Sequence, residues 1–265
     1  MNSRDLSLPD IQALPDARNI AIDAVGIRDL RYPVTLLAGG RPVGAVATFA
    51  MTVGLHAAAK GTHMSRFVEI LESQREPLDR VRFLGMVERM RERLGAASGR
   101  IEMRFTHFVR KTAPVSGVSS LIDVDACWTG HRGGDGESAM RIRVTVPATS
   151  LCPCSKEISD YGAHNQRSHI TIDALVTGEI SIDELVGLAQ RNASCEVYGL
   201  LKRADERHVT QQAYDNPRFV EDIVRDVAIC LDGEPRIASY AVAVENFESI
   251  HNHSAIASLR REPPR

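Results

Sequence analysis

The chain has 265 residues, of which 43% are hydrophobic and 25% are charged. This composition is typical of a globular protein, so long disorder is excluded and a sizeable core is expected. The formal net charge of −2 argues against a nucleic-acid partner recognised through overall charge. An anionic ligand would therefore need a local basic site.

The sequence predicts a cytoplasmic protein without a membrane partner. The longest apolar stretch, Val43–Leu55, contains Gly44 and Gly54 and is typical of a strand rather than a membrane span. No apolar segment of a signal peptide follows Arg4 and Asp5. Five cysteines are an odd number in a chain of this size, which favours free thiols and a reducing compartment over a disulfide framework.

The first half of the chain predicts strands, two helices and further strands. Residues 1–25 contain two prolines and show no clean period, so we expect an extended N-terminal arm. Apolar residues at helical spacing predict the helices, and strict alternation predicts the later strands. The expected elements are strands over 33–57, helices near 64–73 and 78–94, and strands over 101–106 and 120–126.

The second half predicts the same order of elements. A capping box of Ser181 and Glu184 marks one helix start, and Asn216-Pro217 is expected to begin a long helix. Alternation predicts strands over 142–146 and 170–176 before these helices, and a final strand over 237–247 after them.

The predicted strands imply antiparallel sheets with helices on one face, an α+β fold. The glycine-rich segment Gly130–Glu137 is the best internal boundary. The expected organisation is therefore an arm over 1–25, a first module over 26–132 and a second module over 133–265.

The densest cluster of reactive side chains lies in Ser150–His169, expected as a long loop between two strands. It contains Cys152, Cys154 and His164. Thiol and imidazole can bind a divalent metal, or a histidine can activate a cysteine nucleophile. The Cys-x-Cys spacing is not that of a zinc ribbon, so metal binding, catalysis and packing all stay open on spacing alone. The other cysteines are expected as small core residues: Cys127, Cys195 and Cys230.

Three other groups have both functional and structural interpretations. The segment 204–208 contains Glu206, and its composition favours a solvated charged turn before a helix. Glu221 lies in the first turn of a predicted helix, where a carboxylate complements the helix dipole. His251 and His253, which follow the last predicted strand, could bind a metal or move protons.

A fifth group joins a strand to a helix start and combines cations with a hydroxyl. Free N–H groups at a helix start make such a segment a candidate phosphate site, while a capped helix with exposed cations would explain the same residues. The candidates are Lys60, His63, Ser65 and Arg66.

Taken together, these segments resemble the type IB GTP cyclohydrolase family. The runs that carry the resemblance are KGTHMSRF, SLCPCSKEISDYGAHNQRSH, ASCEVYGLLKRADERHVTQQAYDNPRFVEDIVRD and HNH near the C-terminus. The resemblance covers nearly the whole chain, from about residue 20 to 255. It implies a bimodular chain of two tandem tunnelling-fold modules, whose antiparallel sheets each carry two helices on one face.

The resemblance implies a reaction in which GTP and water give 7,8-dihydroneopterin triphosphate and formate, the first step of folate and pterin biosynthesis. By motif, Cys152, His164 and Glu206 correspond to the ligands of one divalent metal per site. The mixed ligand set suggests Mn²⁺ or Fe²⁺ as replacements for Zn²⁺. Cys154 stays open as the alternative thiol.

The resemblance also assigns the remaining site residues. Glu221 corresponds to the anchor of guanine, since one carboxylate can accept both N1–H and N2–H. Cys152 is carried over as a catalytic residue, as are His251 and His253, one of which would protonate the leaving ring nitrogen. The triphosphate needs a basic pocket, for which the Lys60–Arg66 group is the candidate.

Antiparallel sheets with open edges predict self-association, and tunnelling-fold sheets close only between subunits. We therefore expect a homotetramer with active sites at subunit interfaces.

Two alternatives come from other functional classes. An NADPH-dependent nitrile reductase of the same fold would use Cys152 as a metal-free nucleophile and Glu221 as the base anchor, but it would leave His164 and Glu206 without a role. A structural protein that binds a metal or a purine without turnover is the second alternative.

Overall fold

The structure is a computed structural model that describes residues 10–12, 14–134 and 136–262. Parts of two predicted segments lie outside the described residues: residues 1–9 and 13 of the arm over 1–25, and Asp135 within the predicted internal boundary. The last part of the predicted arm already belongs to a strand, because the first strand begins at Ile22.

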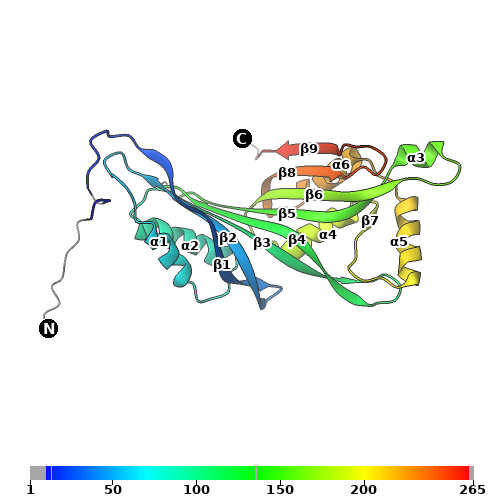
Figure 1. The fold of residues 1–265 in the computed structure, drawn as a ribbon, viewed down its shortest axis with the longest axis horizontal. Coiled ribbons are helices and arrows are strands. Elements are labelled where there is room, and N and C mark those ends of the chain that lie inside the picture. The colour runs from blue at the N-terminus through cyan, green and yellow to red at the C-terminus, as the bar shows by residue number, and fades with distance from the viewer. Residues whose placement is uncertain (1–9, 13, 135, 263–265) are drawn as a thin grey trace. The chain divides into compact units, whose positions relative to one another are not determined.

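The described chain forms strands and helices in the order drawn in Figure 1. The strands are β1 (Ile22–Ala38), β2 (Arg41–Leu55), β3 (Gly99–Thr112), β4 (Ser119–Arg132), β5 (Ser138–Leu151), β6 (Asn165–Val176), β7 (Cys195–Glu196), β8 (Ile237–Asn246) and β9 (Ala255–Arg261). The helices are α1 (Ser65–Glu72), α2 (Arg80–Arg93), α3 (Pro153–Ile158), α4 (Ile182–Arg191), α5 (Arg203–Asp215) and α6 (Val220–Asp232).

The strands are hydrogen-bonded in the order β1-β2-β3-β4-β5-β6-β8-β9, with β7 paired to β5. The pairs β5–β6, β6–β8 and β8–β9 are antiparallel. The predicted α+β class with antiparallel pairing is thus confirmed. Among the described residues, no helix has both the length and the apolar character needed to cross a membrane.

The chain divides into two compact units, each with its own core. The first unit comprises the described residues within 1–37, 42–103 and 129–139, and the second comprises the other described residues. In the first unit, α1 and α2 contact each other and bury the apolar stripes that predicted them. A Cβ on Gly130 of β4 would lie 2.9 Å from Val87 and 3.0 Å from Phe83, so glycine lets α2 approach this strand closely.

In the second unit, α4 and α6 pack against β6 and β8. The predicted capping box begins α4: Ser181 Oγ accepts the N–H of Glu184 at 3.1 Å, and Glu184 accepts the N–H of Ser181 at 2.8 Å. Alternate residues of these strands are buried, among them Ile170 and Val242. This packing leaves the ends of β5, β6 and β8 to carry the loops described below.

Three predictions about the second half are wrong. The segment 204–208 is the start of α5 rather than a turn, and the long helix begins at Val220 rather than at Asn216. Asn216 instead ends α5, and its side chain donates to the carbonyl of Ala193 at 2.9 Å. The strand over 237–247 is not the last one, since β9 follows it.

One predicted core cysteine is also wrong. Cys127 and Cys195 are buried as expected, whereas Cys230 is exposed. Cys230 lies on α6 beside the stripe that packs onto β8, where its thiol accepts a hydrogen bond from the side chain of Asn192 at 3.5 Å.

A buried carboxylate fixes the start of α5. Asp205 is fully buried and accepts the N–H groups of Val115 and Ser116, each at 2.8 Å, the Ser116 hydroxyl at 2.5 Å and the N–H of Lys202 at 2.8 Å. Burial alone would raise the pKa of Asp205. The hydrogen bonds from Ser116, Lys202 and Val115 outweigh burial and hold this pKa well below its usual range.

We expect Asp205→Asn to lower the urea midpoint of unfolding at pH 7, because an amide NH₂ would face N–H and O–H donors. A depressed folded pKa stabilises the fold fully above the unfolded value of about 3.9, and this contribution is lost as pH falls toward the folded pKa. The difference between the parent and Asp205→Asn should therefore shrink below about pH 4. The control is Asp215→Asn, an exposed acid on the same helix, and an equal loss in both variants would contradict the assignment.

Candidate functional site

Cys152 and His164 lie at the two ends of a short connection between β5 and β6. The predicted long loop over Ser150–His169 is shorter than expected, because both strands extend into it and α3 forms between them. Cys152 is the N-cap of α3, and its Sγ accepts the N–H of Ser155 at 3.4 Å. The N–H of Cys152 donates to the carbonyl of His164 at 3.1 Å, so the two residues are adjacent across the connection.

The imidazole of His164 is held through one ring nitrogen. Nδ1 lies 3.0 Å from Oε1 of Gln166 and 3.3 Å from the hydroxyl of Ser249. The backbone N–H of His164 donates to the hydroxyl of Ser155 at 3.2 Å. No hydrogen bond to Nε2 is found within the described part of the chain. A half-buried thiol beside an imidazole with Nε2 available suits a divalent metal of intermediate softness.

The third expected ligand, Glu206, is not joined to this pair. Helix α5 approaches α3 near its C-terminal end, where Lys156 Nζ donates to the carbonyl of Tyr214 at 2.5 Å and lies 4.3 Å from its ring centroid. Glu206 is eight residues earlier, about 12 Å along the helix axis at 1.5 Å per residue. Accordingly, no three His, Cys, Asp or Glu side chains of the described residues gather closely enough to hold a metal.

Cys154, the alternative thiol, is exposed on α3. Unlike Cys152, it follows the helix start rather than capping it, and the backbone hydrogen bond to His164 belongs to Cys152.

Glu221 lies exposed in the first turn of α6, as the sequence predicts. The capping role belongs to its neighbour, because the carboxylate of Asp222 accepts the N–H of Phe219 at 3.0 Å. The N–H of Arg218 donates to the carbonyl of Leu151 at 3.0 Å, which anchors the approach to α6 beside the strand end that carries Cys152. Glu221 therefore has no capping role, and it follows the anchored Arg218 by three residues.

His251 and His253 lie exposed on the connection between β8 and β9. Their rings stack, with centroids 5.1 Å apart and an interplanar angle of 9°. Ser249, on the same connection, contacts the ring of His164 at 3.3 Å. This connection therefore brings the two histidines into the neighbourhood of the Cys152–His164 pair.

The predicted phosphate group lies in the first unit, before and at the start of α1. Lys60 and Ser65 are exposed, and His63 Nε2 lies 3.2 Å from the carboxylate of Asp10. Residue Met64 occupies the N-cap position and makes no side-chain capping bond. The interpretation as a side-chain-capped helix start therefore does not hold. The Lys60 cation interacts electrostatically with Asp16.

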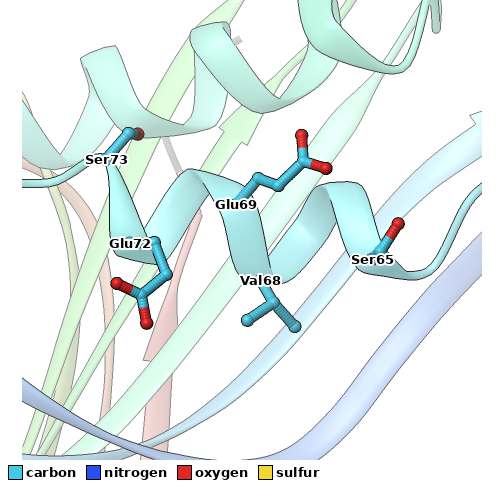
Figure 2. Close-up of a pocket in the computed structure, with 5 residues that line it drawn as sticks. All are labelled: Ser65, Val68, Glu69, Glu72 and Ser73. Atoms are coloured by element: carbon cyan, nitrogen blue, oxygen red, sulfur yellow. The ribbon is translucent and has the colours of Figure 1, made fainter. Parts of the chain in front are cut away.

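A hollow of about 630 Å³ lies along α1 and is lined by Ser65, Val68, Glu69, Glu72 and Ser73. Figure 2 shows these five side chains on the helix. Glu69 pairs with Arg93 at 2.8 Å, and Glu72 accepts a hydrogen bond from Tyr32. Two carboxylates make this hollow unfavourable for an anion. Its presence beside Ser65 therefore adds nothing to a phosphate site.

The sequence did not single out Gln166, Ser249 or the cluster around Lys111. Lys111 pairs with Glu196, donates to Gln190 Oε1 at 2.7 Å and lies 5.4 Å from the ring centroid of Tyr198. Burial, followed by the nearby Glu196 carboxylate, raises the pKa of Tyr198 to about 12. Every member of this cluster has a partner, which indicates a structural role.

Solved structures share the fold at low sequence identity. Uricase from Arthrobacter globiformis matches with a TM-score of 0.54 at 12% identity, covering 92% of this chain and 95% of that one. A hyperthermostable mutant of the Bacillus sp. TB-90 urate oxidase matches with a TM-score of 0.51 at 8% identity, covering 91% and 99%. These likenesses establish the tunnelling fold and nothing about the chemistry.

Sequence comparison gives the family. The family model described as type I GTP cyclohydrolase folE2 matches residues 8–257. A protein named GTP cyclohydrolase FolE2 1 from Dechloromonas aromatica is 57% identical over 256 residues, 96% of each chain. GTP cyclohydrolase FolE2 from Ralstonia nicotianae is 52% identical over 258 residues, 97% of this chain and 96% of its own. The chain therefore belongs to the type I GTP cyclohydrolase family of the FolE2 class, the type IB family.

Proposed function

We propose that this protein is a GTP cyclohydrolase that converts GTP and water into 7,8-dihydroneopterin triphosphate and formate, the first step of folate biosynthesis. The observation that carries the proposal is the Cys152–His164 pair, in which a thiol and an imidazole with Nε2 available lie at one end of the sheet. Family membership over nearly the full chain supports the same reaction.

The residues present fit a divalent metal in part. Cys152 Sγ and His164 Nε2 would hold it, with Glu206 as the third ligand. A bound divalent metal would supply water of lowered pKa, about 7 instead of 15.7, which attack on C8 of guanine requires near neutral pH. The thiolate, imidazole and carboxylate set is less soft than a set of two thiolates and imidazole, so Mn²⁺ and Fe²⁺ are proposed alongside Zn²⁺.

The carboxylate of Glu221 would bind and orient the base. It is exposed at the start of α6, and Asp222 leaves it free of the capping role. N1–H and N2–H of guanine are adjacent donors that one carboxylate accepts together, so this contact would select guanine over adenine. Orientation of the base would then direct C8 toward the Cys152–His164 pair.

His251 or His253 would hold and deliver the proton that the leaving ring nitrogen needs. Because the two imidazoles stack on each other, either ring would serve as the proton donor. The β8–β9 connection that carries them also contacts His164 through Ser249. Lys60, His63, Ser65 and Arg66 would hold the triphosphate. An incoming phosphate would compete with Asp10 for His63, since both are anions.

We further propose that the enzyme is a homotetramer with active sites between subunits. The offset of about 12 Å between Glu206 and the α3 contact supports a site in which a second copy supplies Glu206. Each half begins with two long strands, continues through helices and ends with two further strands, and this supports a bimodular chain, although the second half adds α3, β7 and a third longer helix. The cytoplasmic location stays a prediction.

Chelator-treated protein should not turn over GTP, and added Mn²⁺ or Zn²⁺ should restore turnover. The readout is the fluorescent pterin formed after oxidation and dephosphorylation, with formate as a second product. A folded oligomer that forms no pterin with any of these metals would contradict the proposal, and NADPH-dependent reduction of a deazaguanine nitrile would then favour the reductase.

Two single variants should separate metal binding from base binding. Cys152→Ala should lose turnover and bound metal while it retains GTP binding. Glu221→Ala should retain metal and raise the KM for GTP at least about tenfold, because it removes hydrogen bonds to a charged acceptor. If Glu221→Ala leaves KM unchanged, Glu221 does not anchor the base.

Mixed oligomers should test whether two copies share one site. Cys152→Ser and Glu206→Gln subunits are each expected to be inactive alone. After co-expression, random pairing gives about a quarter of the sites one intact Cys152 and one intact Glu206 from different copies. We expect about that fraction of parental activity, whereas no activity would place all three ligands on a single chain.

A further inference from the structure

We propose that Gln166 is a positioning residue that sets the ring orientation and tautomer of His164, with Ser249 in a lesser supporting role. The inference rests on the proposed function, because it concerns the metal-binding nitrogen of that site. It concerns the residues that hold the ligand rather than the ligands themselves.

The side chain of Gln166 presents a hydrogen-bond acceptor to the ring of His164. The atom of Gln166 that lies 3.0 Å from Nδ1 is Oε1, a carbonyl oxygen that can only accept. Nδ1 of His164 must therefore carry the proton and donate. In a neutral imidazole the other nitrogen, Nε2, then presents its lone pair, which is the form that binds a metal.

The strand position that carries Gln166 is rigidly held. Gln166 is only 7% exposed, and it lies in β6 directly opposite Ser150 of β5. Ser168, two residues further along β6, pairs with Asn246 of β8. The hydroxyls of Ser150 and Ser168 both donate to Asn246 Oδ1, at 2.9 and 2.6 Å. Gln166 thus stands on a part of the sheet that is hydrogen-bonded across three strands.

Further contacts converge on His164 from other parts of the chain. The Ser249 hydroxyl reaches the same Nδ1 at 3.3 Å from the connection that follows β8. The backbone of His164 is fixed separately, by Ser155 at its N–H and by Cys152 at its carbonyl. Rotation of the imidazole ring is then the remaining freedom of this residue. Gln166 restrains this rotation with the shorter of the two contacts to Nδ1.

A hydrogen bond to the second nitrogen of a ligating histidine fixes the ring and raises its basicity, and its loss typically weakens metal binding about 10- to 100-fold. Gln166→Leu removes the acceptor at similar size, whereas Gln166→Glu keeps an acceptor oxygen at the same place. The matched control is Gln190→Leu, because Gln190 is also buried, at 1% exposure, and bonds to Lys111 and Pro147 instead.

The experiment titrates the full-length, metal-free oligomer with Co²⁺ against a competing chelator and follows the visible absorption of the bound ion. We expect a dissociation constant about 10- to 100-fold higher for Gln166→Leu, within about threefold of the parent for Gln166→Glu, and unchanged for Gln190→Leu. The concentration of Mn²⁺ that gives half-maximal GTP turnover should rise in parallel for Gln166→Leu, while the KM for GTP stays constant.

Parental affinity in Gln166→Leu, or an equal loss in Gln190→Leu, would overturn the inference even when the parent produces pterin. A parent that binds no Co²⁺ would overturn both the inference and the ligand assignment. Absence of pterin together with the expected pattern of affinities would overturn the proposed reaction and leave the role of Gln166 intact. The failure of either proposal is therefore distinguishable from the failure of the other.

Discussion

The site depends on the antiparallel register of β5, β6 and β8. This register places Ser150, Ser168 and Asn246 together in the interior, where the two hydroxyls share the amide oxygen of the asparagine. Buried polar groups of this kind are costly unless they are satisfied, so the cluster specifies one alignment of the strands. A shift by one residue would turn every side chain to the opposite face. Cys152 and His164 lie directly beyond the ends of the aligned strands β5 and β6.

Much of the fold could be predicted from local patterns, because each pattern reports a local cause. Alternation along the strands, apolar spacing in α2 and the capping box at Ser181 all describe interactions within a few residues. The start of α6 could not be predicted in the same way. Asn followed by Pro is suited to a helix start, yet the side chain of Asn216 donates a hydrogen bond to the carbonyl of Ala193, which is distant in sequence. The exposure of Cys230 could not be predicted either, because the elements packed against α6 decide which of its residues are buried.

The motifs indicated which residue types carry the chemistry, but the chemistry also depends on contacts that no motif states. The adjacency of Cys152 and His164 follows from a strand ending and a strand beginning, so the sequence could predict their proximity. The contacts of Gln166 and Ser249 with one imidazole nitrogen depend on the register of β6 and on the course of the β8–β9 connection. Both are tertiary features, and single-sequence reasoning has no access to them.

The position of Glu206 follows from the way α5 is held at both ends. Buried Asp205 fixes its first turn to residues 115 and 116, and Lys156 holds Tyr214 near its last turn. A helix restrained at both ends cannot rotate or slide to bring its fourth residue to α3, because either motion breaks one of these anchors. Closure of the ligand set within one chain by a movement of α5 would therefore break at least one of these two anchors. A second copy would offer its own Glu206 without disturbing either anchor, and this favours the proposed arrangement with the site between subunits.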